Sequence, residues 1–518
     1  MMTATVLSLT LTLIAAPPAS PASPASPASP PAASQPTSSW TFQAVLKRAL
    51  TRNRDLLRAG LDLAAARQDV SAARGQFDPT LGAGISYRRS TAVPVEGLNI
   101  QTLHSSSLDY NLSVSQFLPT GGKVSLGLST TRSTSLSRFS FSDTPFDNQT
   151  ETWDTALTLS VTHPLLKGVG TDKNMAAIRQ ARLARGAAAW AARAKAEAVV
   201  RDLYKAYLDV VTAEAAVRVQ RDAVAQADRD LKRALALVGA GRMAEADLVD
   251  YRFALAQQER GLLEAHTTWL QASLALRLQT GEHLQPGAGV VTTQLPHSPF
   301  SGSTPTAQQA ADAAMRHSRD LLAALKTLRI KEITLVTSDR DTWPSLDLSA
   351  AIGPQGRADS FGKAHETLFK FKSLGWSVGL TFSYLIGNRA ARAARAKARL
   401  DVKRQKVAID ELKQSLVSEA TRTVAQLRLA MRIARTAELE HRLAVLRLAN
   451  ERKKQAVGRS SLYVVLQMQN EVTSTAYKAF SARMDVLKRR AELAALTGTL
   501  LERLHLRTKE VKALRLHR

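Results

Sequence analysis

Hydrophobic and polar residues alternate strictly along several short stretches of the chain. The clearest stretch is 374–384, LGWSVGLTFSY, in which large apolar residues alternate with glycine, serine or threonine. Successive side chains of a strand point to opposite faces, so this pattern predicts a strand with one apolar face and one small, polar face. The same alternation predicts strands within 81–87, 108–114, 124–128, 153–161 and 346–352. We expect the polar segments 88–107, 134–151 and 353–373 to form long irregular loops.

Two other segments, 173–237 and 389–455, are rich in alanine, arginine and leucine and contain no proline. They predict helices of some 65 residues, roughly 100 Å long at ~1.5 Å per residue. Each is followed by a turn and a return helix, at 243–279 and 460–505. Helices of this length indicate coiled coils or long bundles.

The order of these elements occurs twice. Residues 54–57 recur at 319–322 with an offset of 265, residues 153–160 match 376–383 at 223, and residues 241–242 match 458–459 at 217. The first half therefore carries about forty extra residues, which fall between Pro79 and Trp153 in the strand region. An internal duplication of this length indicates that both halves bury equivalent faces.

The duplication and the composition together divide the chain. We predict a signal peptide (1–19), a Pro/Ala/Ser-rich linker (20–39), a first repeat (40–281), an inter-repeat linker (282–305), a second repeat (306–505) and a basic tail (506–518). Each repeat is expected to begin with a helix. In the first repeat the strands then fall within 79–163 and the long helix pair within 173–280; in the second, the strands fall within 344–386 and the helix pair within 389–505. No Lys or Arg precedes the apolar VLSLTLTLIAA, so the translation start and the cleavage site stay open.

Beyond the predicted signal, no apolar stretch approaches the ~18–20 residues of a membrane-spanning helix, so a membrane crossing has to use strands. Alternating strands of this kind are typical of a transmembrane β-barrel, and half of a soluble β-sandwich is the alternative. A few strands cannot close a barrel alone, so closure requires several copies of the chain. The formal net charge of +26 suits an anionic lipid or a nucleic acid. The predicted export signal, the 5% aromatic content and the lack of a binding motif argue against nucleic acid.

The sequence offers no support for catalysis, a metal site or a cofactor. Cysteine is absent, and the ten histidines show no ligand spacing. Gly121-Gly122-Lys123 resembles a phosphate-binding loop, but position 117 is Phe where that motif needs glycine, and a tight hairpin turn is expected instead. Glu245 and Asp247 are the only weak candidates for binding a cation.

The duplicated order, the strand that runs into a long helix in WSVGLTFSYLIGNRAARAARAKA, and the turns VGAGRMAEADLVDYR and VGRSSLYVVLQMQN carry a resemblance to a known family. Over residues 40–505 the chain resembles the TolC-like outer-membrane efflux proteins. The resemblance implies an internally duplicated α+β membrane protein, a homotrimer whose strands close one transmembrane β-barrel that a long α-helical periplasmic tunnel continues. The usual number of strands in this family is four per chain. Because of the extra residues, the sequence does not decide whether four or six strands of each chain belong to the barrel.

The resemblance also implies a location and a function. It places the chain in the outer membrane of a Gram-negative-type cell, in contact with outer-membrane lipid and extending into the periplasm. There it would act as the passive exit duct of a tripartite efflux or type I secretion system, with a periplasmic adaptor that gates it and an inner-membrane transporter that drives small molecules or polypeptides. The alternative is a periplasmic structural coiled-coil protein that binds an anionic envelope polymer.

Three groups of residues are candidate sites. The first group is the two helix turns, which the resemblance implies are adaptor-docking tips: Gly241, Arg242, Asp247, Leu248, Gly458, Arg459 and Tyr463. In the family a glycine of the turn is followed six residues later by Asp and then an apolar residue. Gly241 with Asp247-Leu248 matches this pattern, whereas the residue six positions after Gly458 is Val464. The second group is a set of arginines at the starts of the two long helices: Arg179, Arg182, Arg185, Arg389, Arg392 and Arg395. They could form a basic ring in the tunnel or contact lipid phosphates, and a solvated helix face is the alternative. Membrane-interface aromatics would be Trp153, Trp376 and Tyr384.

Overall fold

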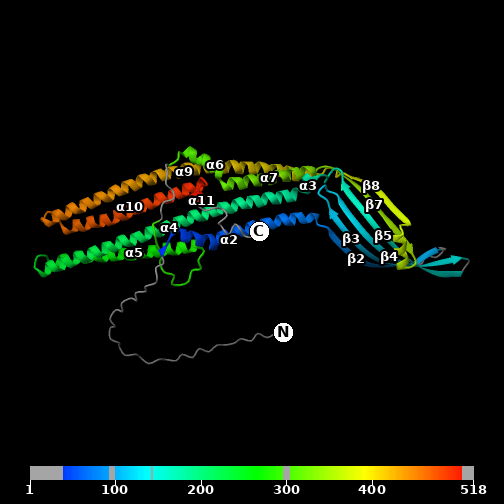
Figure 1. Ribbon diagram of the computed structural model, residues 1–518, viewed down its shortest axis with the longest axis horizontal. Coiled ribbons are helices and arrows are strands. Elements are labelled where there is room, and N and C mark those ends of the chain that lie inside the picture. Colours follow the sequence, from blue (N-terminus) through cyan, green and yellow to red (C-terminus); the bar gives the residue numbers. More distant parts are fainter. Residues whose placement is uncertain (1–38, 93–99, 142–143, 296–303, 505–518) are drawn as a thin grey trace, which may run out of the picture. The chain divides into compact units, whose positions relative to one another are not determined.

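Two pairs of long antiparallel helices lead into one six-stranded sheet (Figure 1). The computed structural model describes residues 39–92, 100–141, 144–295 and 304–504, all within the unit Ser38–Arg518. The predicted signal peptide and basic tail, and all but residue 39 of the first linker, lie outside the described residues. No helix in the described part of the chain is long and apolar enough to cross a membrane.

Each half contributes four main helices. In the first half these are α1 (Phe42–Arg52), α2 (Arg54–Arg74), α4 (Ala176–Gly239) and α5 (Leu248–Thr280). In the second they are α6 (Ala307–His317), α7 (Arg319–Arg340), α9 (Arg389–Ala456) and α10 (Leu462–Leu496). Shorter segments are η1 (Gly75–Phe77), α3 (Thr171–Asn174), η2 (Glu245–Asp247), α8 (Phe361–Phe369) and α11 (Leu500–Arg503). The 64-residue α4 packs along α5, and the 68-residue α9 packs along α10.

Short polar side chains mark the same helix starts in both halves. Thr41 and Asn53 cap α1 and α2, and Thr306 and Ser318, each 265 residues later, cap α6 and α7. Each side-chain oxygen accepts a hydrogen bond from the backbone N–H three residues on, at 3.1–3.4 Å. Such caps satisfy donors that a helix start leaves free, so the two halves begin and break their helices for the same local reason.

The sheet contains β2 (Thr80–Thr91), β3 (Ile100–Phe117), β4 (Lys123–Phe141), β5 (Thr144–Pro164), β7 (Ser345–Ala358) and β8 (Ser373–Ser383). They pair antiparallel in that order, so the extra residues of the first half form strands β3 and β4 inside the sheet. The glycine turn at 118–122 joins these two strands, as expected for a hairpin. A separate parallel pair consists of β1 (Ser39–Trp40) and β6 (Thr292–Thr293).

The prediction of long irregular loops was wrong in most of its extent. Strands β2 to β5 continue through most of the described parts of 88–107 and 134–151, and α8 occupies the centre of 353–373. The outer parts of these strands have polar residues on both faces, so they lack the apolar alternation that reveals a strand. The backbone ladder continues through them, and cross-strand side-chain pairs accompany it, for example Arg132–Glu151 (2.8 Å), Arg138–Asp147 (2.7 Å) and the stacked rings of Phe139 and Phe146 (5.2 Å between centroids).

The pairing register places one apolar residue of every strand in a single row. The row contains Leu81, Val114, Leu126, Leu159, Ile352 and Trp376. A row of the opposite face contains small or polar residues from all six strands: Gly84, Asn111, Ser129, Ala156, Gln355 and Ser373. Strands β3 and β4 therefore share the two-faced character of the original four.

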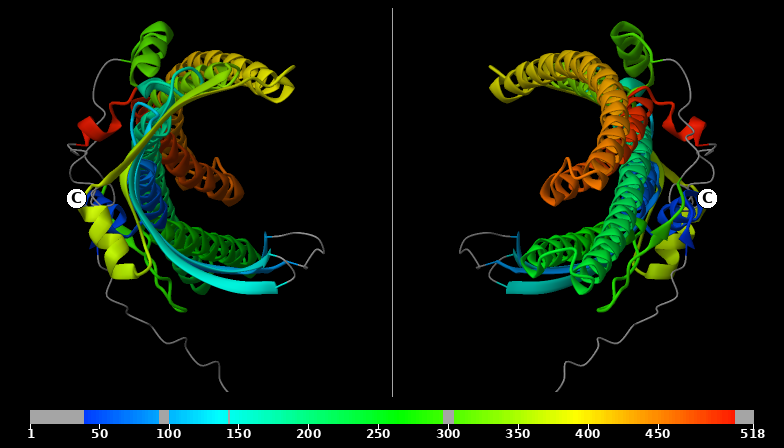
Figure 2. Two further views of the ribbon diagram at one scale, coloured as in Figure 1. Left: turned by 90° about the vertical axis from the view of Figure 1, so that its right-hand side faces the viewer. Right: turned by 90° about the vertical axis from the view of Figure 1, so that its left-hand side faces the viewer.

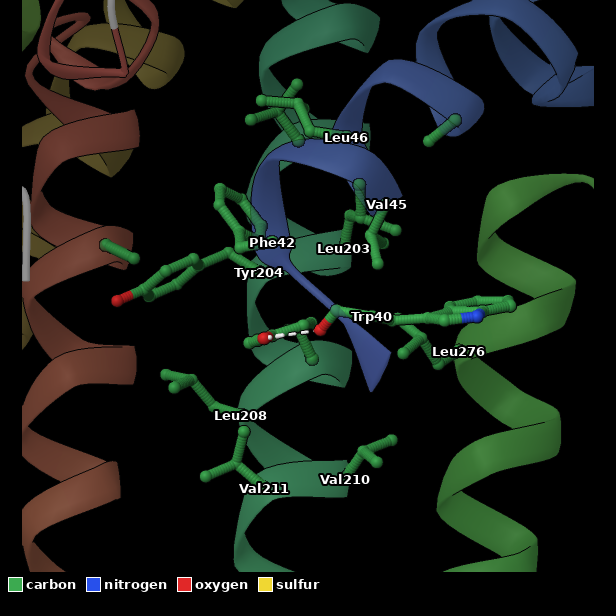
Figure 3. Packing of buried hydrophobic residues seen from close by; sticks show 14 of the residues in the cluster. Trp40, Phe42, Val45, Leu46, Leu203, Tyr204, Leu208, Val210, Val211 and Leu276 are labelled. Carbon is green, nitrogen blue, oxygen red and sulfur yellow. Dashed lines mark hydrogen bonds between the residues drawn. The ribbon is translucent and has the colours of Figure 1, made fainter. Parts of the chain in front are cut away.

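The main hydrophobic core lies among the helices, around the middle of α4. Phe42 of α1 contacts the rings of Tyr204 and Tyr207 edge-on, at 5.0 and 5.5 Å between ring centroids (Figure 3). The Tyr207 hydroxyl lies 2.9 Å from the carbonyl oxygen of Trp40, and burial raises its pKa to about 12. This core packs α1, α4, α5 and α10 against one another.

Candidate functional site

Both helix turns use the same backbone motif. Gly241 has φ +68° and donates its N–H to the carbonyl of Val238 (2.9 Å), while Arg242 donates to Leu237 (2.8 Å). At the second turn Gly458 has φ +71°, and it and Arg459 make the equivalent bonds at 3.0 and 2.9 Å. These are Schellman motifs, in which glycine tolerates the left-handed conformation. Both turns lie at the end of the helices opposite to the sheet (Figure 1).

The predicted residues of the first turn separate into two groups. Gly241, Arg242 and Asp247 are exposed. Leu248 is 6% exposed and packs with Ala234 and Tyr251 in a small hydrophobic cluster. Leu248 thus holds α4 against α5, and its side chain is not available at the surface of the turn.

Exposed apolar side chains surround both turns. At the second turn Gly458 and Arg459 are exposed, as is Tyr463 (71%), and Val457 beside them is 70% exposed. At the first turn Val249 and Phe253 are 65% and 69% exposed. Val249, Phe253 and Val457 were not predicted from the sequence, because an apolar residue in a helical repeat gives no sign of whether its face is covered. We call these seven exposed residues the tip surface: Arg242, Asp247, Val249, Phe253, Val457, Arg459 and Tyr463.

The two helix pairs are linked a few turns away from the tips. The side-chain amide of Gln258 on α5 donates to that of Asn470 on α10 at 2.6 Å. Apart from Leu466, the residues around this bond are small or polar, including Ala223, Ala227 and Thr473. The link therefore joins the ends of the two halves through a hydrogen bond and not through a hydrophobic core.

The predicted basic residues lie at the starts of α4 and α9, next to the sheet. Arg179 forms an ion pair with Asp172 (2.7 Å), and Arg395 forms one with Asp339 (2.7 Å). The other four are exposed and form no ion pair within the described part of the chain: Arg182, Arg185, Arg389 and Arg392. The structure thus provides two neutralised arginines and four that are free to meet an anion.

The predicted aromatic residues occupy different positions on the sheet. Trp376 is 74% exposed in the apolar row, and Tyr384 is 50% exposed just after β8, where the chain turns towards α9. Trp153 is partly covered by Phe361 of α8, at 5.4 Å between ring centroids, and donates its ring N–H to Glu151 (3.0 Å). Trp153 and Trp376 match in the sequence repeat but do not pair in the sheet.

A polar cleft lies where α4, α7, α9 and α10 meet. Glu197 faces Arg319 at 3.2 Å, and burial raises the pKa of this carboxyl although Arg319 opposes the shift. On the other side, burial acts to raise the pKa of Glu492, but hydrogen bonds from Lys205 (2.6 Å) and Arg489 (2.8 Å) outweigh it and hold the pKa below its ordinary value. No group of three His, Asp or Glu side chains within the described ranges is arranged to hold a metal ion.

The fold matches solved structures of outer-membrane channels over most of its length. The CmeC outer membrane channel of Campylobacter jejuni is 14% identical, with 92% of this chain and 90% of that chain covered and a TM-score of 0.63. The open state of the MtrE outer membrane channel of Neisseria gonorrhoeae is 16% identical, with 89% of each chain covered and a TM-score of 0.62. A structure of CusC is 14% identical, with 88% of this chain and 91% of that chain covered and a TM-score of 0.65. At these identities the likeness concerns the fold alone.

The sequence itself also matches a family. Residues 123–282, which span β4, β5 and the first long helix pair, match the family model described as outer membrane efflux protein. No curated protein matches the chain. The family match over these residues and the shared fold confirm the resemblance to the TolC-like outer-membrane efflux proteins that the duplicated strands and helices indicated.

Proposed function

We propose that this chain forms the outer-membrane exit channel of a tripartite efflux or type I secretion system. The observation that carries the proposal is the apolar row, which holds one residue from each of the six strands. All six side chains are exposed in the single chain, from 43% at Leu159 to 74% at Trp376. A face of this kind is unfavourable in water and favourable in lipid.

The sheet also has the polarity and the curvature of a barrel wall. Its opposite face is lined by glycine, serine and other small or polar residues, as expected for a water-filled lumen. Helix α8 packs on the apolar face, and Figure 2 shows α8 (yellow) outside the curve of the sheet. The apolar face is therefore the convex one, which supports lipid outside and water inside.

The open edges of the sheet support assembly from several copies. Strands β2 and β8 are the two edges, and unpaired edge groups are not tolerated in lipid. Because six is an even number, β8 of one copy can pair antiparallel with β2 of the next. Three copies would give 18 strands, a number that leaves an aqueous channel in known barrels.

We further propose that the tip surface docks a periplasmic adaptor that opens the channel to an inner-membrane transporter. Four of its seven residues are large apolar or aromatic side chains that stay 65–71% exposed, and arginines flank both turns. Exposed aromatic and arginine side chains are typical of binding hot spots. The duct itself would be passive and would need no catalytic group, because the energy would come from the transporter.

Fractionation and disulfide trapping test the channel proposal. The intact chain should be confined to the outer membrane and should give a heat-sensitive band near three times the 56.1 kDa monomer mass. The chain contains no cysteine, so Ser377→Cys on β8 can be combined in turn with Gly82→Cys, Gly84→Cys or Ser86→Cys on β2. One of these pairs should give covalent trimers under oxidation, whereas a soluble monomer without cross-links would favour the coiled-coil alternative.

A further inference from the structure

Helix α8 covers a small polar area on the apolar face of the sheet. Ala364 and Leu368 are buried (0% and 1% exposed), and His365 lies 3.4 Å from the hydroxyl of Thr130. Thr130 in turn lies 3.0 Å from the hydroxyl of Thr155 on the neighbouring strand. The helix thus shields two threonine hydroxyls that would otherwise lie on the proposed lipid side.

A glycine allows this close packing. A Cβ added to Gly356 of β7 would lie 2.1 Å from the carbonyl oxygen of Ala364, so only glycine lets α8 approach the strand this closely. The helix is therefore fitted to the sheet and does not merely connect two strands. Its position is at the end of β7 and the start of β8, away from the long helices (Figure 1).

Aromatic side chains lie at both ends of α8. Phe361 packs against Trp153 of the sheet and stays 51% exposed, whereas Phe369 and Phe371, at and just after the end of the helix, are 67% and 63% exposed. Leu374 (57%) and Trp376 (74%) continue this surface on β8 into the apolar row. The aromatic residues of α8 are therefore continuous with the face that the proposed function places in lipid.

Basic residues accompany these aromatic residues. Lys363 pairs with Asp359 at 3.1 Å, and Lys370 pairs with Glu366. Lys372 follows directly, flanked by Phe371, and forms no ion pair among the described residues. Counting Arg357, four basic and two acidic side chains lie between 357 and 372, so the segment is net positive.

We propose that α8 and residues 369–372 anchor the outer end of the barrel in the outer leaflet of the membrane, with the phenylalanines in the acyl region and the lysines on anionic headgroup phosphates. This inference rests on the proposed function, because it requires the apolar face of the sheet to lie in lipid. Amphipathic helices with aromatic residues on one side and lysines on the other bind at the interface in this way. The proposed trimer would therefore have three such anchors, one from each chain.

Site-directed spin labelling tests the position of α8 in the intact protein reconstituted in vesicles. Three single-cysteine variants are compared: Phe369→Cys on α8, Val378→Cys on the apolar face of β8, and Ser377→Cys on its polar face. We expect the nitroxides at 369 and 378 to be more accessible to oxygen, which concentrates in lipid, than to a water-soluble nickel chelate. The nitroxide at 377 should show the reverse.

The pattern of the three labels separates the two proposals. A label at 378 in lipid with a label at 369 in water would overturn the anchor and leave the channel intact. A label at 378 in water would contradict the channel, and the anchor with it. A label at 369 that neither reagent reaches would mean that protein covers α8, which also overturns the anchor.

A second measurement tests the lysines. A fluorophore is attached to the Phe369→Cys variant, and its quenching is measured with nitroxide-labelled phosphatidylglycerol, which is anionic, and with nitroxide-labelled phosphatidylcholine, which is zwitterionic. The quantity determined is the quenching by phosphatidylglycerol divided by the quenching by phosphatidylcholine. Lys363→Gln, Lys370→Gln and Lys372→Gln together should lower this ratio, by up to about fivefold per lysine. The matched control removes the same charge from α9, with Lys403→Gln, Lys406→Gln and Lys413→Gln, and should leave the ratio unchanged. An equal ratio in all three proteins would refute headgroup binding.

Discussion

Gly281 packs directly against the backbone carbonyl of Arg52, so that a Cβ on Gly281 would lie 2.2 Å from that oxygen. The amide of Asn53 secures the same junction by donating to the carbonyl of Gln279 (2.8 Å). In the second half a Cβ on Gly498 would lie 2.7 Å from the Cβ of His317, the residue 265 positions after Arg52. In both halves, therefore, the end of the return helix packs on the break between two helices.

Gly281→Ala should destabilise the protein much more than Gly241→Ala. Both glycines have positive φ, +75° and +68°, which costs a side chain about 1–2 kcal/mol. A Cβ on Gly241 meets no described atom within 4 Å, whereas one on Gly281 collides with the α1–α2 junction. We expect Gly241→Ala to lower the melting temperature of the assembled protein slightly and Gly281→Ala to reduce its yield. Equal effects would mean that the close contact is unimportant.

Leu126→Arg should impair insertion into the outer membrane. Leu126 lies in the apolar row and is 46% exposed, and arginine on the lipid side of a barrel costs about 2–4 kcal/mol near the midplane. Ser129→Arg, three residues on, places the same charge on the polar face and should assemble normally. The measurement is the amount of heat-sensitive trimer in the outer-membrane fraction. Normal assembly of both variants would contradict a lipid-facing row.

Phe253→Ala with Tyr463→Ala should abolish export without reducing the amount of trimer. Both side chains belong to the tip surface, are about 70% exposed and pack on little within their own chain. Truncation of aromatic hot-spot residues commonly costs 2 kcal/mol or more, which is roughly a thirtyfold loss of affinity. Export is measured as the accumulation of a fluorescent dye in cells that depend on this channel.

The control for this prediction is Leu263→Ala on the same helix. Leu263 is 68% exposed but lies ten residues beyond Phe253, away from the turn. It should leave export unchanged if docking is confined to the tips. If the double variant exported normally at normal trimer levels, the tip surface would not be the docking site.

Glu492→Gln should make the protein less sensitive to acid. Lys205 and Arg489 outweigh the effect of burial and lower the pKa of Glu492 from its ordinary 4.5. The ionised carboxylate therefore stabilises the folded state above that value, and this contribution is lost as the pH falls below it. The melting temperature of the wild type should decrease between about pH 6 and pH 3.5 by more than that of the variant.

Glu197→Gln, in the same cleft, should have the opposite effect and make the protein more sensitive to acid. Burial raises the pKa of Glu197, so the folded state binds this proton more tightly than the unfolded state does. Protonation of Glu197 therefore adds to the stability of the folded state as the pH falls through that raised pKa. Replacing Glu197 removes this gain, so the melting temperature of the variant should fall more steeply in acid than that of the wild type. If both variants changed the pH dependence of the melting temperature in the same direction, the opposite pKa shifts given to Glu197 and Glu492 would be wrong.

The local sequence by itself determined the long helices and the strands with one apolar face. Alternation at 374–384 and the repeated Gly-Arg pairs at 241 and 458 act over a few residues, so one sequence is enough to recognise them. The duplication also indicated that the two halves pack in equivalent ways, and the contacts of Gly281 and Gly498 agree with this. The tip glycines could be found in the same way, because positive φ strongly favours glycine.

Only the tertiary structure decided that β3 and β4 lie inside the sheet and that Leu248 is buried while Phe253 is exposed. Strand order and burial depend on contacts between residues far apart in the chain, and a local pattern does not contain them. The outer parts of the strands and helix α8 were missed for the same reason. They depend on cross-strand pairing and on the packing of Ala364 on Gly356, which exist only once the sheet has formed.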